Sequence, residues 1–136
     1  MTRPLAALAA LTFVMGMNAQ ELPPEIQAKF LKILLSATGQ FGFACSDPGF
    51  KTKLESAGIA VSTGFKMAWA SSEAETKALK AAGKLVIVPN LAWLKAGGSI
   101  ALVEEDGKPS LHLNMANLKA SGMVLSDTII KMAKQS

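Results

Sequence analysis

The sequence has four residues at positions where an α/β domain would bind a ligand: Asp47, Trp69, Asn90 and Trp93. Asp47 follows the apolar segment 41–45, and Asn90 follows the apolar segment 85–88. Ligands of open α/β sheets bind at the carboxyl ends of the strands, where such residues would meet. A carboxylate and an amide offer hydrogen bonds, and indole rings offer apolar surface. The chemistry that these residue types favour is therefore binding.

Each of the four residues also has a purely structural interpretation, and the sequence leaves both open. Asp47 precedes Pro48 and can cap a helix over residues 48–57. Asn90 can cap a short helix in the same way. Trp69 and Trp93 are the two tryptophans of the chain, and each is either part of the core or an exposed anchor for a partner.

Other side chains could serve catalysis or bind metal, but their patterns argue against these roles. His112 lies between Leu111 and Leu113 and faces away from them, so we expect a surface or edge residue. The carboxylates of 104–106 are expected at a solvated hairpin tip, where nothing separates their pKa values. The chain has one cysteine, Cys45, and neither a GxSxG motif nor a glycine-rich phosphate loop. We expect no catalytic residue, metal site, disulfide or cofactor.

The first 19 residues have the features of a secretory signal peptide. Arg3 supplies the positive charge, and the apolar run 5–17 is shorter than the roughly 20 residues that cross a bilayer as a helix. Ala19 is the expected cleavage point and Gly16 a second one, while an uncleaved N-terminal anchor is the alternative. The sequence predicts export to the periplasm and a single mature domain over residues 20–136.

Charge and composition narrow the class of partner. The chain of 136 residues carries 14 Lys+Arg against 10 Asp+Glu, and its one arginine, Arg3, lies in the predicted signal. Arginine makes most bidentate contacts to phosphates and bases, and the lysines form no basic cluster, so nucleic acid is not an expected partner. With 50% hydrophobic and 18% charged residues, the chain is expected to be globular.

The segments that must position these side chains alternate between helical and strand periodicity. Pro24 opens a helix that ends at Gly39, with an apolar stripe expected at Ile26, Phe30, Ile33, Leu34 and Ala37. Further helices are predicted at 48–57, 72–83, 90–94, 114–120 and 126–134. Strands are predicted at 41–45, 59–61, 65–69, 85–88, 100–103 and 111–113, and a brief extended segment at 123–125.

This alternation predicts an α/β fold. We expect a layered sandwich with a mostly parallel central sheet and helices on both faces. The Asp106-Gly107 pair between the last two strands predicts an antiparallel C-terminal hairpin.

From Gly97 onward the chain resembles the YfiR/HmsC-like family of periplasmic regulators. The resemblance is carried by Gly97-Gly98-Ser99-Ile100-Ala101-Leu102, the Asp106-Gly107 turn, Leu111-His112-Leu113-Asn114 and the segment 118–126. Ser46-Asp47-Pro48-Gly49-Phe50 and the helix 26–34 are similar more loosely. Residues 20–136 would then form one YfiR-like α/β domain.

The resemblance implies a protein that is not an enzyme. Better-known members of the family bind the periplasmic portion of an inner-membrane diguanylate cyclase and hold it inactive. The chain departs from the family in having one cysteine, so the cysteine pairs of those members cannot form within it. We expect a regulator that represses such a cyclase, or an inner-membrane sensor, by protein contact. A periplasmic small-molecule-binding domain is the alternative, and a homodimer stays open as an assembly.

Overall fold

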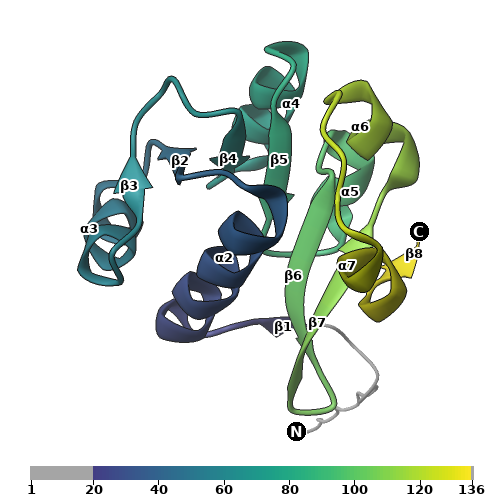
Figure 1. Cartoon of the computed structure of the whole chain (residues 1–136), viewed down its shortest axis with the longest axis horizontal. Coiled ribbons are helices and arrows are strands. Elements are labelled where there is room, and N and C mark those ends of the chain that lie inside the picture. Colours follow the sequence, from purple (N-terminus) through teal and green to yellow (C-terminus); the bar gives the residue numbers. More distant parts are fainter. Residues whose placement is uncertain (1–19, 136) are drawn as a thin grey trace, which may run out of the picture.

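The computed structural model of the chain describes residues 20–135 (Figure 1). The predicted signal peptide, residues 1–19, lies outside the described residues. The strands are β1 (Gln20–Glu21), β2 (Gly42–Cys45), β3 (Ala60–Val61), β4 (Met67–Trp69), β5 (Leu85–Val88), β6 (Ile100–Glu105), β7 (Lys108–Leu113) and β8 (Lys134–Gln135). The helices are α2 (Pro24–Thr38), α3 (Pro48–Ser56), α4 (Glu73–Ala81), α5 (Ala92–Ala96), α6 (Met115–Ala120) and α7 (Asp127–Met132). Within this part of the chain, no helix has the length and apolar character needed to cross a membrane.

The strands form one sheet in the order β3-β2-β4-β5-β6-β7-β8, and β1 pairs with β6 beside this path. The pairs from β3 to β6 are parallel, and the β6–β7 hairpin is antiparallel. Asp106 and Gly107 form the hairpin turn with φ values of 54° and 75°, the left-handed region that an Asp-Gly turn requires. The predicted α/β fold with a parallel centre and an antiparallel hairpin is confirmed.

Helices cover both faces of the sheet (Figure 1). Leu85 and Ile87 of β5 point into the larger core, which α2, α3, α6 and α7 complete. Val86 and Val88 alternate with them and point into a smaller core that α4 and α5 cover. All four side chains are fully buried, as expected for a central strand between two helical layers. The predicted layered sandwich is therefore present.

Three local predictions were wrong. Phe41 was expected in the first buried strand, but β2 begins at Gly42 and Phe41 is 82% exposed. The last helix was expected to run to residue 134, but it ends at Met132, and the chain then pairs with β7 as β8. Thirdly, Ile33 of the predicted stripe on α2 is exposed. The buried side chains of α2 are Gln27, Ala28, Leu31, Leu34 and Leu35.

The error on α2 has a physical cause. The helix carries two apolar sets at helical spacing, one containing Ile26, Phe30 and Ile33 and the other Ala28, Leu31 and Leu35. The way in which α2 packs on the sheet selects the second set, which also contains the polar residue Gln27. A face with a polar residue near its start scores worse in a sequence pattern than a purely apolar face.

Candidate functional site: a pocket at the carboxyl ends of the central strands

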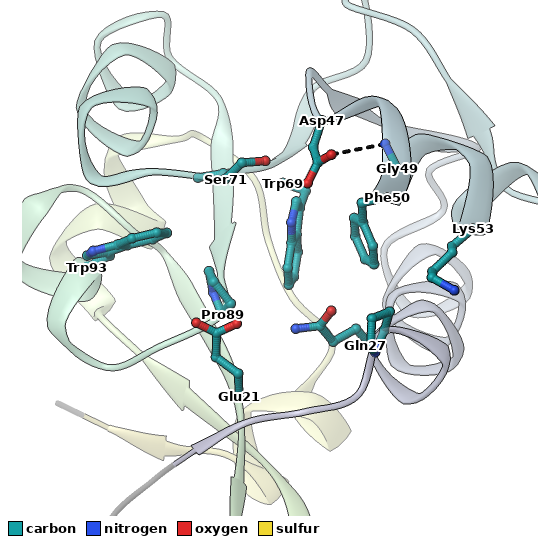
Figure 2. Close-up of a pocket in the computed structure, with 12 residues that line it drawn as sticks. Glu21, Gln27, Asp47, Gly49, Phe50, Lys53, Trp69, Ser71, Pro89 and Trp93 are labelled. Atoms are coloured by element: carbon teal, nitrogen blue, oxygen red, sulfur yellow. Dashed lines mark hydrogen bonds between the residues drawn. The ribbon is translucent and has the colours of Figure 1, made fainter.

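A pocket of about 380 Å³ opens at the carboxyl ends of β2, β4 and β5 (Figure 2). The segments that leave these strands line it, and α2 and β1 close it from the side. We call it the strand-end pocket. Its apolar lining consists of Pro24, Phe50, Trp69, Ala70, Pro89 and Trp93. Its polar lining consists of Glu21, Gln27, Asp47, Lys53 and Ser71. A pocket of this size with an apolar wall and a few polar groups has the usual form of a small-ligand site.

The two tryptophans belong to opposite sides of the strand-end pocket (Figure 2). Trp69 is the last residue of β4, is 4% exposed, and packs against Phe50 of α3 with ring centroids 4.7 Å apart. Trp93 of α5 is half-buried and packs against the smaller core. The two interpretations of these residues thus apply together, because each ring is partly core and also lines the pocket.

Asp47 is both a helix cap and a pocket residue. Its Oδ1 accepts a hydrogen bond of 3.0 Å from the backbone N–H of Gly49, as a cap of α3 should. The same carboxylate lines the strand-end pocket. Asn90, the fourth predicted residue, lies next to Pro89 and outside the pocket lining. Its Oδ1 accepts from the N–H of Trp93 at 3.1 Å, so its side chain supports the turn that presents Trp93.

Glu75 of α4 holds two of the loops that shape the pocket. Its carboxylate accepts a hydrogen bond of 2.7 Å from the N–H of Ser71 and another from the hydroxyl of Ser46. Ser46 precedes α3, and Ser71 follows β4. Ser72 caps α4 by accepting from the N–H of Glu75 at 3.0 Å. One carboxylate therefore ties together the segments that carry Asp47 and Trp69.

The segment 114–117 fixes the end of α5 through side-chain hydrogen bonds. Asn114 caps α6, and the amide groups of Asn114 and Asn117 both donate to the carbonyl of Leu94, at 3.1 and 2.9 Å. Asn117 also donates to the carbonyl of Gly98 at 3.0 Å. These bonds anchor the end of α5, and α5 carries Trp93. The C-terminal segment thus positions one wall of the strand-end pocket without lining it.

Two polar residues of the β6–β7 hairpin, His112 and Glu105, are more buried than the sequence predicted. His112 is 8% exposed and buried, not a surface residue, although it faces away from Leu111 and Leu113 as predicted. Its Nε2 lies 2.8 Å from Oε1 of Glu105, and Nζ of Lys134 lies 3.0 Å from the same oxygen. We call Glu105, Ser110, His112 and Lys134 the hairpin network.

The hairpin network changes the acidity of Glu105. Hydrogen bonding from His112, with smaller contributions from Ser110 and Lys134, lowers the pKa of Glu105 from its usual 4.5 to about 2, against an opposing effect of burial. The prediction of a fully solvated carboxylate cluster was wrong for this residue, because its side chain contacts those of His112 and Lys134 and is 16% exposed. The network lies on the β6–β7–β8 edge and contributes no residue to the strand-end pocket.

Cys45 is half-buried at the end of β2, and its Sγ lies 3.7 Å from the carbonyl oxygen of Asp47. Burial raises the pKa of the Cys45 thiol, which keeps it protonated and weakly nucleophilic at neutral pH. Among residues 20–135, no three His, Cys, Asp or Glu side chains are grouped so as to hold a metal ion.

Sequence reasoning identified Asp47, Trp69 and Trp93 of the pocket. It missed Gln27 and Glu21, which also line the pocket, and Glu75, which holds two of its loops. Gln27 is 5% exposed, and its amide points into the pocket (Figure 2). A signal for it was present, because it stands four residues before Leu31, which belongs to the second face of α2. Glu21 is placed by the pairing of β1 with β6, a long-range contact that leaves no local signal.

Comparisons with known proteins address the fold. No protein-family model matches the chain, and no curated protein matches it. A solved structure of a conserved domain protein from Vibrio cholerae is similar at a TM-score of 0.59 and 13% identity over 83% of this chain. A structure of an ABC domain in complex with L-Trp from Streptococcus pneumoniae is similar at 0.56 and 13% identity, again over 83%. The chain spans 60% and 61% of these two proteins, and the likeness is one of fold.

Proposed function

We propose that this chain is an exported regulatory protein that acts by binding and not by catalysis. In this proposal it represses a membrane-bound diguanylate cyclase through contact with the periplasmic portion of that enzyme. The partner comes from the resemblance of residues 97–126 to the YfiR/HmsC-like regulators. The observation that carries the binding role is the strand-end pocket, in which indole rings from two different elements face a common space.

The mechanism would be a shift of population. A protein that binds the inhibited conformation of a cyclase more tightly than the active one moves the equilibrium toward the inhibited state. The shift is limited by the difference in the two affinities, about 1.4 kcal/mol for each factor of ten. Large aromatic side chains in pockets usually dominate such contacts. Of the two tryptophans at the pocket, Trp69 is 4% exposed and Trp93 is half-buried, so Trp93 is the one able to contact a partner.

Deletion of the gene tests the regulatory role. We expect cellular cyclic di-GMP and adhesion to rise after deletion and to return when the wild-type gene is supplied. A Trp93→Ala variant should fail to restore repression. A Val124→Ala variant should restore it, because Val124 is 85% exposed and stands outside the pocket lining, which makes it a matched control for loss of surface apolar area. Unchanged cyclic di-GMP after deletion would contradict the proposal.

A second candidate function is the binding of a small molecule in the strand-end pocket. Its volume and mixed lining favour this candidate, and so does the L-Trp bound by one of the proteins that share the fold. A ligand that binds only the folded state raises the melting temperature in proportion to the logarithm of its concentration. A thermal-shift screen of the purified protein tests the candidate, and a screen without any stabilising compound would count against it.

A further inference from the structure

The side chain of Gln27 is a buried polar group with no hydrogen-bond partner among the residues that the structure describes. It is 5% exposed, and within residues 20–135 its amide forms no hydrogen bond to the protein. Figure 2 shows the amide directed into the strand-end pocket, on the side of Glu21 and Pro89. Buried polar side chains in folded proteins nearly always have hydrogen-bond partners. A ligand in the pocket would supply the missing partner.

The charged groups around this amide are predominantly negative. The carboxylates of Glu21 and Asp47 line the pocket, and neither forms an ion pair with a basic side chain of the described residues. The basic residue of the lining, Lys53, is 3.0 Å from Glu25 and is neutralised there. An anion in the pocket would meet two carboxylates and no free cation, whereas a cation would be attracted by both.

The aromatic walls favour the same kind of ligand. The faces of indole rings attract ammonium groups, most strongly where water is excluded. Trp69 and Trp93 line the pocket from two sides, and Phe50 extends the apolar surface behind Trp69 (Figure 2). A ligand with both an apolar body and an amine could pack its body against these rings and direct its amine toward a carboxylate of the pocket.

We propose that the strand-end pocket binds a small organic cation, an amine with a compact apolar body. The ammonium group lies between the indole rings and the carboxylate of Glu21, where Gln27 accepts a hydrogen bond from it, and Asp47 at the opposite end of the pocket adds to the negative potential (Figure 2). This proposal rests on the small-molecule candidate described above and specifies its ligand class. It does not depend on the identity of the cyclase.

Three probes with the same phenyl body separate charge from shape: phenethylamine is a cation, phenethyl alcohol is neutral, and phenylpropionate is an anion. The two tryptophans both line the pocket, so the intrinsic fluorescence of the purified chain reports binding directly. We expect the amine to bind about tenfold more tightly than the alcohol, and the anion to bind most weakly. Equal or tighter binding of the anion, or no response to any probe, would overturn the proposal.

Variants of the carboxylates give a second test. Glu21→Gln should weaken binding of the amine by about tenfold and leave the alcohol unchanged. Asp47→Asn should act in the same direction, and asparagine still caps α3, so the fold is preserved. Glu55→Gln is the matched control, because Glu55 is an exposed carboxylate of α3 outside the pocket lining. An amine affinity that is the same in Glu21→Gln, Asp47→Asn and wild type would contradict the proposed contacts.

The outcomes distinguish this proposal from the proposed function. If the anion binds best, the small-molecule candidate stands and the cation class is wrong. If the amine binds as expected while deletion leaves cyclic di-GMP unchanged, the ligand class stands and the cyclase partner is wrong.

Discussion

The strand-end pocket and the hairpin network contain similar residue types and use them in opposite ways. In the hairpin network, one carboxylate oxygen of Glu105 is within 3.0 Å of both His112 and Lys134. In the pocket, the amide of Gln27 has no partner in the described residues, and the carboxylate of Glu21 has no basic neighbour there. The polar groups of the hairpin network are hydrogen-bonded within the protein, whereas the amide of Gln27 in the strand-end pocket lacks such a partner among the described residues.

This difference separates polar groups that support the fold from polar groups that serve binding. A buried cluster whose polar groups are all hydrogen-bonded contributes to stability. An unsatisfied buried polar group lowers the free energy of unfolding, and such groups are rare in folded proteins. A protein keeps such a cost where function requires it. The contrast supports the proposal that the pocket serves binding while the hairpin network stabilises the fold, and stability measurements can test both parts.

The largest effect is expected from His112→Ala. The substitution removes a buried ring and leaves Glu105 without its main hydrogen-bond partner, so the free energy of unfolding should fall by about 2–3 kcal/mol. Urea denaturation followed by circular dichroism measures this. Lys108→Ala on the same hairpin is exposed and should change the value by less than about 0.5 kcal/mol. Equal effects of the two substitutions would place His112 outside any stabilising cluster.

The second-largest effect is expected from acid, which should lower the free energy of unfolding by protonating Glu105 of the hairpin network. The pKa of Glu105 is lower in the folded protein than its usual 4.5, so its contribution to stability is complete above about pH 4.5 and is lost as the pH falls toward 2. Allowing for solvent screening, we expect this contribution to be about 1–2 kcal/mol.

The acid prediction is checked by comparing wild type with Glu105→Gln. The difference in their free energies of unfolding should be largest at pH 7 and should shrink by about 1 kcal/mol at about pH 3, where the carboxyl of the folded protein is still mostly ionised. A difference that stays constant over this range would show that Glu105 titrates normally in the folded protein.

Gln27→Met tests the strand-end pocket, and we expect it to raise the free energy of unfolding, whereas His112→Ala lowers it. Replacing an unsatisfied buried amide by a flexible apolar side chain of similar length should raise the free energy of unfolding by about 1 kcal/mol in the absence of ligand. The same variant should lose affinity for the amine probe. A control on the same helix, Lys29→Met, is exposed and should leave both quantities unchanged. A destabilised Gln27→Met protein would show that the amide is already satisfied.

The smallest effect is expected from Lys134→Ala. Its ammonium group bonds to Glu105, but the side chain is 62% exposed, so the ion pair should contribute no more than about 0.5 kcal/mol. High salt should reduce even this difference. A loss above 1 kcal/mol on urea denaturation would show that β8 is held by this contact more than by its backbone pairing.

Much of the fold followed from local patterns. The apolar run Leu85–Val88 predicted a strand covered on both faces, and the Asp106-Gly107 pair predicted the hairpin. Asp47, which precedes Pro48 and was named as a possible cap, does cap the helix that follows it. Local signals failed at Phe41 and at the end of α7, because an exposed aromatic and a short edge strand both depend on distant neighbours.

The pocket was predicted only in part. The rule that ligands bind at the carboxyl ends of parallel strands brought Asp47, Trp69 and Trp93 to the correct end of the sheet. It did not supply Gln27 or Glu21, which come from α2 and β1. It also placed Asn90 in the pocket, whereas Asn90 lies outside the lining and caps the turn before Trp93.

By itself, the sequence determined most of the helices and strands, the α/β class and the end of the sheet at which a pocket would form, because periodicity, caps and turn residues act over a few positions. The tertiary structure decided which face of α2 is buried, that Glu105 and His112 meet, and that Gln27 is buried with no hydrogen-bond partner in residues 20–135. Those outcomes depend on the packing of elements that are far apart in the chain, and each local pattern was compatible with more than one such packing.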